Sequence, residues 1–415
     1  MVRIAWLDAS VAEQQRMREL AGLFHERETR DELGLGPVRE SLGSTCFPGS
    51  STLHTRARYL LFLPWLRLLA YERGAAAATI GEEIRRLEQQ LSHHMLTHSR
   101  EADLTGLFGA RGQNVDRWAC DVYNGLLIEH GILLDPAVPG SRRLIAELGL
   151  EDITARTPHP SLPAPPPDFP LIEDGFRLSA AESSWLKERI LTAHPHTVLA
   201  HFLHHPPSPD SSTPWDDPAA ATISGPAAEH LRMAEQFSVT LHGAQLLYNL
   251  LLARAQQELF TQQGTPEAAA ASPEEYLERL QHWAHKAREV TQRLGPWDPA
   301  ETLEAVQVQQ GRRVTAGLRG FLTEWTQVLR AAGPEGISTS AEAEQLVRRR
   351  ENILKRTQSR FTNRSLLASW SGATGAGLAT MRWGASVQRI LLDIHQGLET
   401  APAEDFLVGS EVAHA

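Results

Sequence analysis

Lysine, on which many phosphate-binding and nuclease sites depend, occurs in this chain only at Lys187, Lys286 and Lys355. A phosphate-binding loop places Ser or Thr after its lysine, so that an ammonium group and a magnesium-binding hydroxyl meet the same phosphates. None of the three is followed by a hydroxyl residue, and none has the Glu or His two positions earlier that restriction-type or phospholipase-D-like nucleases require. The sequence therefore names no reaction.

Two pairs of histidines have the spacing of zinc ligands. His201 and His205 lie four residues apart, as do His94 and His98, so that each pair could share a zinc ion on a helix with a third ligand. Pro206 follows His205 directly and ends the helix, so no carboxylate can follow this pair as a further ligand within the helix. No Glu stands next to His94, as a metalloprotease helix would require. We therefore expect no metal site and no cofactor.

The strongest charge feature is a basic cluster on a helix predicted over residues 342–364. Arg356, Arg360 and Arg364 lie four residues apart and would share one helix face. A basic ridge of this kind suits a phosphate backbone or an acidic partner, and a solvated helix face is the alternative. The other candidate binding residues in this cluster are Arg348, Arg349 and Lys355.

A second candidate surface is a short helix, polar turn and helix over residues 104–134. With the helix before it, this pattern resembles the latter part of a winged helix over about residues 79–135, whose second helix would enter a DNA major groove. Two packed helices without DNA are the alternative. The candidate DNA contacts are Arg111, Gln113, Asn114 and Arg117.

A polar network is expected near the N-terminus, because arginine forks beside acids suit bidentate ion pairs that hold a loop against a helix. We predict that Asp31 or Glu32 pairs with Arg56 or Arg58, with Arg30 in the same network.

Composition limits the class of protein. The 415 residues carry a net charge of −10, so no global field attracts nucleic acid or an acidic membrane. Cys46 and Cys120 are too few for a disulfide framework, and no apolar run is long enough to span a bilayer. We expect a soluble, cytoplasmic protein.

Apolar residues recur mostly at helical spacing, which predicts a mainly α fold. We expect a helical N-terminal domain over residues 1–150, a Pro-rich connector with one helix over 151–225, a C-terminal helical bundle over 226–400 and a disordered tail over 401–415. Prolines concentrated between residues 155 and 175 prevent a helix or inner strand there. Ser179 and Glu182 mark a helix start, and Gly372–Gly377 is predicted to be a flexible interhelical loop. Further helices are predicted over 227–260, 276–294, 318–329 and 378–398.

Several stretches together resemble one bacterial family. They are residues 6–8 (WLD), 29–34 (TRDELG), 47–51 (FPGSS), 55–59 (TRARY), 62–65 (FLPW), 156–160 (RTPHP), 247–251 (LYNLL), 370–372 (WSG), 382–383 (RW) and 393–398 (DIHQGL). The chain resembles, along nearly its whole length, a bacterial family of unknown function numbered 6361. The resemblance implies no activity, but it associates the chain with anti-phage or restriction-type gene islands.

We therefore expect a non-catalytic accessory subunit of such a defence system, which binds DNA or partner proteins such as a helicase or a nuclease, and no membrane. One alternative is an enzyme with a scattered polar active site around Asp31 and Arg56, and another is a helical scaffold that binds no nucleic acid. A basic groove from Arg111–Arg117 to Arg348–Arg364 would favour DNA, whereas a deep pocket around Asp31 and Arg56 would favour an enzyme.

Overall fold

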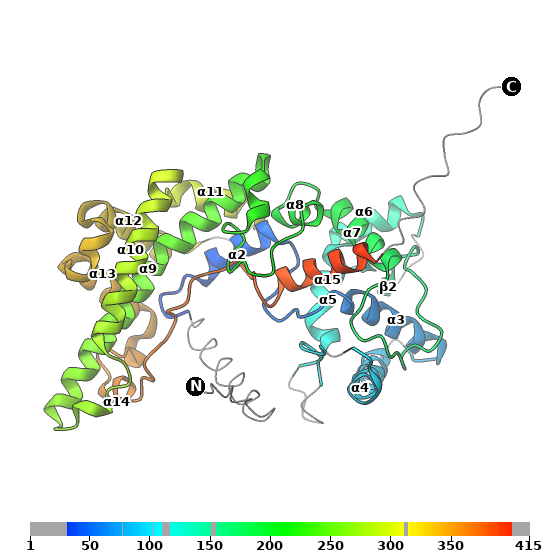
Figure 1. Ribbon diagram of the computed structural model, residues 1–415, viewed down its shortest axis with the longest axis horizontal. Helices are drawn as coiled ribbons and strands as arrows, with labels where there is room; N and C mark the ends of the chain where they lie inside the picture. The colour runs from blue at the N-terminus through cyan, green and yellow to red at the C-terminus, as the bar shows by residue number, and fades with distance from the viewer. Residues whose placement is uncertain are drawn as a thin grey trace, which may run out of the picture. The chain divides into compact units, whose positions relative to one another are not determined.

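The computed structural model describes residues 31–76, 78–101, 103–109, 117–150, 155–310 and 314–400. Within these residues the chain is mainly α-helical, as predicted, with fourteen α-helices and one two-stranded sheet (Figure 1). No helix in this part of the chain has both the length and the apolar content needed to cross a membrane.

The described chain divides into two compact units, each built from two separate stretches. Unit 1 contains the residues up to Leu42 together with Arg232–Ala379, and unit 2 contains Gly43–Leu231 together with the residues from Thr380 onward. These boundaries differ from those expected. The Pro-rich segment lies inside unit 2 instead of between domains, and the last helix returns to unit 2. The predicted tail, residues 401–415, lies outside the described residues.

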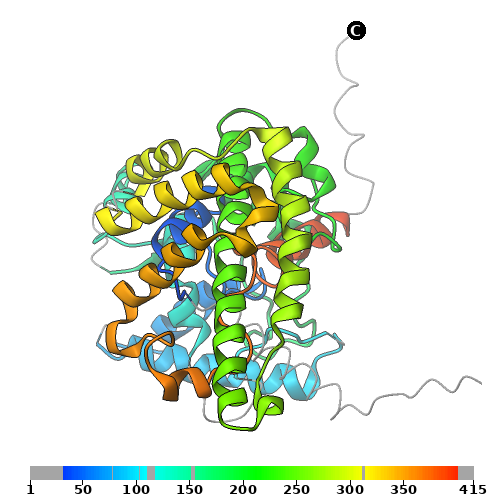
Figure 2. The same ribbon diagram turned by 90° about the vertical axis from the view of Figure 1, so that its left-hand side faces the viewer.

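Unit 1 is a bundle of long helices. Helix α9 (Gly225–Gln262) and helix α10 (Pro273–Leu294) run side by side in it (Figures 1 and 2). Gly243 permits their close approach, because a Cβ there would lie 2.2 Å from the Trp283 ring. The Trp283 indole also donates to the Val239 carbonyl at 2.7 Å. Helix α12 (Ala316–Gly336) packs on both α10 and α13 (Ala341–Lys355).

The helix predicted over residues 342–364 is interrupted, so the ridge prediction was wrong in its geometry. Helix α13 ends at Lys355, and Arg356 adopts φ 51° and ψ −117°. A short 3-10 turn follows, and helix α14 begins only at Arg364 (Arg364–Ala368). Arg360 lies between these helices, where its backbone N–H donates to Glu351 at 2.9 Å. Arg356, Arg360 and Arg364 therefore do not share a helix face.

Unit 2 is centred on helix α3 (Tyr59–Glu72), most of which is buried. It packs on α4 (Ile80–His98) and α5 (Ala119–Glu129), while α7 (Ala180–Ala193) packs on α15 (Val387–Glu399). The predicted helix start is confirmed, since Ser179 and Glu182 form a capping box at the N-terminus of α7. The smaller helices of this unit are α6 (Pro139–Glu147) and α8 (Val198–His204).

One short sheet joins the Pro-rich segment to the rest of unit 2. Strand β1 (Leu133–Leu134) pairs antiparallel with β2 (Thr157–Pro158), so that Leu133 lies opposite Pro158. Proline is tolerated there because it lies at a sheet edge. Of the helix, turn and helix predicted over residues 104–134, the second helix is α5, but the described residues 103–109 form turns instead of the short first helix. The turn that would face DNA, residues 110–116, lies outside the described residues.

Candidate functional site

The predicted arginine network forms buried ion pairs, but with partners other than those expected. Arg56, 2% exposed, donates to Asp393 at 2.9 Å and lies 3.5 Å from Glu101. Arg58 is also 2% exposed and pairs with two carboxylates that come after Pro170, Asp174 at 2.9 Å and Glu182 at 3.4 Å. Both arginines are therefore structural residues of unit 2.

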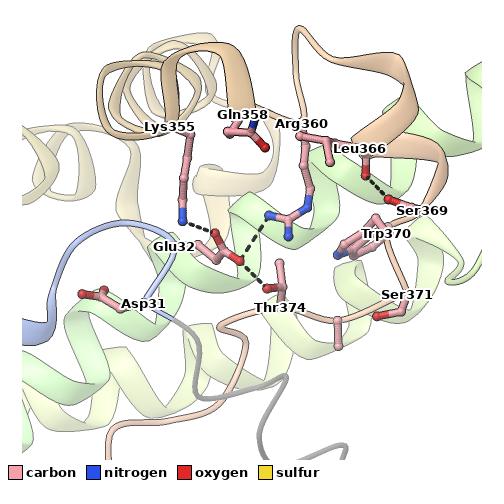
Figure 3. Close-up of a pocket in the computed structure, with 11 residues that line it drawn as sticks. Asp31, Glu32, Lys355, Gln358, Arg360, Leu366, Ser369, Trp370, Ser371 and Thr374 are labelled. Carbon is pink, nitrogen blue, oxygen red and sulfur yellow. Dashed lines mark hydrogen bonds and ion pairs between the residues drawn. The ribbon is translucent and has the colours of Figure 1, made fainter.

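A polar cavity of about 510 Å³ lies in unit 1 (Figure 3). Three stretches that are distant in the sequence form it: the segment before helix α2 (Gly36–Cys46), the turn after α13, and the loop after α14. Its lining residues are Asp31, Glu32, Lys355, Gln358, Arg360, Leu366, Ser369, Trp370, Ser371, Ala373 and Thr374.

Glu32 organises the charges of this cavity. Its side chain is buried and lies 2.8 Å from the Lys355 ammonium and 3.2 Å from the Arg360 guanidinium. The Thr374 hydroxyl donates to the same carboxylate at 2.7 Å. Arg360 also donates to the Tyr248 hydroxyl at 3.1 Å, which ties the cavity to helix α9. One carboxylate thus fixes the positions of two cations (Figure 3).

Glu32 is held in its charged form by these contacts. Burial alone would raise the pKa of its carboxyl group, but hydrogen bonds from Lys355 and Thr374 and the charge of Arg360 outweigh that effect. The pKa of Glu32 is consequently lowered from the 4.5 of an ordinary glutamate. The site therefore contains a stable carboxylate and two cations near neutral pH.

Asp31 has a different role from its neighbour. Its two carboxylate oxygens accept from the backbone N–H groups of Leu35 and Gly36, at 2.6 and 2.7 Å, where helix α2 begins. A carboxylate at a helix N-terminus satisfies free N–H groups and interacts favourably with the helix dipole. Asp31 lines the cavity while its oxygens hold this helix start.

The Gly-rich run after α14 is not a free loop, because buried amides of helix α9 hold it. Asn249 exchanges two hydrogen bonds with the Thr374 backbone, at 2.8 and 2.9 Å. Gln256 donates to the carbonyls of Leu367 and Trp370, at 3.0 and 2.9 Å. Both amide side chains are 0% exposed. The signal that could have revealed this arrangement is two uncharged polar residues inside the apolar stripe of a long helix.

Trp370 forms part of the cavity wall and has an unsatisfied donor. The residue is 4% exposed, and its indole N–H finds no acceptor among the described residues. Buried donors without partners are rare in folded proteins. In Figure 3 the indole nitrogen lies on the side of the ring that faces Arg360 and Thr374.

Two arginines of the predicted basic cluster, and Arg350 beside them, are engaged within unit 1. Arg348 pairs with Glu344 at 2.8 Å, and Arg349 pairs with Glu324. Arg350 is buried, and its guanidinium donates to backbone carbonyls that include that of Leu33 at 2.9 Å. Much of the cluster's positive charge is therefore neutralised or buried, which its sequence alone did not show.

Arg356 and Arg364 remain available. Both are exposed, and neither has an ion pair or side-chain hydrogen bond within the described residues. In unit 2, Arg117 is also exposed. The remaining predicted site residues, Arg30, Arg111, Gln113 and Asn114, lie outside the described residues.

The histidine pairs have local contacts. The His201 and His205 rings lie 4.5 Å apart, and His201 contacts the Ala219 carbonyl at 2.8 Å. The His94 and His98 rings stack at 4.4 Å. In the parts of the chain that the structure covers, no group of three or more His, Cys, Asp or Glu residues is arranged to hold a metal ion.

Comparison with known proteins places the chain by family. No curated protein and no solved structure matches it significantly. One family model matches residues 1–395, which is nearly the whole chain. The protein therefore belongs to the family of unknown function DUF6361.

Proposed function

We propose that this protein is a non-catalytic binding subunit of a bacterial anti-phage defence or restriction-type system. We further propose that residues 355–364, called here the basic segment, bind the DNA backbone. The assignment to such a system rests on the family resemblance of the sequence. DNA binding rests on the charge and exposure of the basic segment.

The observation that carries the proposal is the state of Arg356 and Arg364. They are exposed and unpaired within the described residues, whereas the other cations of the cluster contact carboxylates or backbone carbonyls of the same unit. Arg356 also adopts a positive φ, which side-chain-bearing residues rarely do. Such outliers concentrate at functional sites. Two exposed guanidinium groups, one on the turn after α13 and one at the first residue of α14, suit phosphate contacts.

The enzyme alternative is less well supported by the same geometry. Asp31 does line a cavity, but its carboxylate is occupied by the start of helix α2. Glu32 is contacted by two cations and a hydroxyl, which makes it a poor general base. Arg56 belongs to unit 2 and is buried in its own ion pairs. These contacts favour binding over acid–base chemistry.

The test is the double substitution Arg356→Glu and Arg364→Glu, measured by DNA binding as a function of salt. Each lost phosphate contact should reduce the salt slope by about 0.9, so the slope should fall by about two units. Affinity should weaken alike for all DNA sequences. The matched control is Arg142→Glu with Arg143→Glu, which reverses two exposed charges on helix α6. The control should bind DNA like the wild type.

Two other results would decide against DNA. If DNA affinity stays constant while co-purification with a partner subunit is lost, the basic segment binds an acidic protein surface. If both interactions survive, the two arginines belong to a solvated surface and the protein acts as a scaffold through other residues.

A further inference from the structure

We infer that the cavity in unit 1 binds a phosphate monoester, carried by a molecule about the size of a mononucleotide. This inference goes beyond the proposed function, because it concerns a small ligand and holds whether or not DNA lies along the basic segment. It rests on the two cations that Glu32 positions, on the unpartnered indole N–H of Trp370 and on the volume of the cavity.

Glu32 positions the two cations of the cavity, and both keep N–H donors that a ligand could use. Lys355 and Arg360 both contact Glu32, yet their side chains remain 34% and 18% exposed. An ammonium has three N–H donors and a guanidinium has five, so several remain for a ligand. Glu32 thus acts as a positioning residue, and the exposed donors of both cations are those that phosphate oxygens prefer.

One donor of the cavity wall lacks an acceptor. The Trp370 indole N–H is buried without a partner, and its nitrogen faces the side of Arg360 and Thr374 (Figure 3). A ligand oxygen on that side would supply the missing acceptor. Ser371 and Gln358 are exposed on the cavity wall and add a hydroxyl and an amide. A phosphate group offers three acceptor oxygens to such a set.

The donors of the cavity favour a phosphate monoester over a carboxylate. The charges that line the cavity cancel, since Lys355 and Arg360 stand against Asp31 and Glu32, and Asp31 already accepts from two backbone N–H groups. The ligand is therefore selected by its acceptor atoms, and a phosphate monoester offers three such oxygens where a carboxylate offers two. The monoester is the better match for two cationic side chains and the indole N–H of Trp370.

The volume indicates more than a free phosphate ion. Sites for small molecules usually enclose about 300–1,000 Å³, and this cavity has about 510 Å³. Leu366 and Ala373 supply apolar wall beside the polar groups. A free nucleotide and the phosphorylated end of a nucleic-acid strand present the same chemistry here.

The test is calorimetric titration of the full chain with AMP, with inorganic phosphate and with adenosine. AMP should bind most tightly, phosphate more weakly, and adenosine not at all. Ser371→Trp should fill the cavity and weaken AMP binding at least about tenfold, as expected for loss of well-ordered hydrogen bonds. The matched control is Ser365→Trp, an exposed serine of helix α14 that does not line the cavity, which should bind AMP like the wild type.

A second variant keeps the test valid if Ser371→Trp fails to fold. Trp370→Phe removes the indole donor while preserving an aromatic side chain, and it should weaken AMP binding by about three- to tenfold. Absence of AMP and phosphate binding by the wild type would overturn the inference. Equal weakening by Ser365→Trp and Ser371→Trp would do the same.

The two sources of the ligand are separated by oligonucleotides. If the source is a strand end, a 5′-phosphorylated oligonucleotide should bind more tightly than its 5′-hydroxyl form, and Ser371→Trp should abolish that difference. If it is a free nucleotide, AMP binds and the two oligonucleotides bind alike. Neither result depends on duplex binding by the basic segment, since Ser371→Trp should leave the duplex salt slope unchanged. Failure of one proposal is therefore distinguishable from failure of the other.

Discussion

Glu32 and Asp31 are adjacent acids, but their carboxylates have different partners and therefore different roles. Asp31 accepts from backbone N–H groups at the start of a helix, while Glu32 is buried among side-chain cations. A buried carboxylate stabilises a fold only when its contacts offset the loss of hydration. For Glu32 the pKa is lowered, so its contacts with Lys355, Thr374 and Arg360 outweigh the effect of burial.

Replacing Glu32 by Gln should lower the free energy of unfolding by about 1–3 kcal/mol at pH 7, because charge-assisted hydrogen bonds are lost. The pKa of Glu32 is lowered in the folded protein, so its stabilising effect is complete above the ordinary value of 4.5. That effect is lost as the pH falls through the lower folded value. Urea denaturation of both proteins should therefore show a difference at pH 7 that shrinks below pH 4.5.

The control for this prediction is Glu147→Gln, which removes an exposed acid paired with Arg143 on the surface of α6. It should change stability little at any pH. A stability difference for Glu32→Gln that stayed constant down to pH 3 would show that the glutamine disturbs packing instead of charge.

At the scale of elements, sequence periodicity located the long helices and missed what interrupts one of them. Helices α9 and α10 cover Gly225–Gln262 and Pro273–Leu294, close to the predicted 227–260 and 276–294, because their apolar spacing is unbroken. Helix α13 ends at Lys355, where neither Gly nor Pro marks a stop. Beyond this end, Arg360 contacts residues distant in the sequence, Glu32 and Tyr248, which helical spacing does not reveal. Of the residues that line the cavity, only Asp31 was expected at a pocket, because the other lining residues come from distant segments of the sequence.

The turn after α13 should be more stable with glycine at position 356. Arg356 has φ 51° and ψ −117°, a conformation that costs about 1–3 kcal/mol for a residue with a side chain. Arg356→Gly should raise the free energy of unfolding by about 1 kcal/mol in urea denaturation, while weakening DNA binding by one phosphate contact.

The matched substitution is Arg319→Gly, at an exposed position near the start of helix α12. Glycine should lower stability there by about 1 kcal/mol, because it favours the unfolded chain over a helix. If both glycines lower the free energy of unfolding equally, the backbone of Arg356 is not strained and its positive φ does not reduce stability.

At the scale of the whole molecule, the two units are discontinuous, since each is built from two separate stretches of the chain. Unit 2 depends on a residue near the end of the chain, since Asp393 accepts from both the side chain of Arg56 and the backbone N–H of Ala57. The prolines that predicted a junction instead lie inside this unit. A scan along the sequence finds linkers between consecutive domains. It cannot detect that α15 packs in the same unit as residues 43–231, because residues 232–379 separate them in the sequence.

Asp393→Ala should destabilise unit 2 by about 3–5 kcal/mol, because it leaves the buried Arg56 without its nearest carboxylate. Hydrogen exchange should report faster opening of helices α3 and α7 than of helices α9 and α10. The control is Asp174→Ala, which removes a half-exposed partner of Arg58 while Glu182 remains. It should cost less than about 1 kcal/mol. Equal destabilisation by the two substitutions would contradict a special role for Asp393.

The return of α15 to unit 2 also sets an order of events on the ribosome. Residues 43–231 emerge early, but the helix that packs on α7 and carries Asp393 is made only after the whole stretch 232–379. At about 5–20 residues per second, that interval lasts on the order of ten seconds. During this time the nascent chain exposes the face of α7 that α15 will cover, and Arg56 lacks its partner Asp393. Unit 1 has all its residues before unit 2 does, although most of unit 2 is synthesised before most of unit 1.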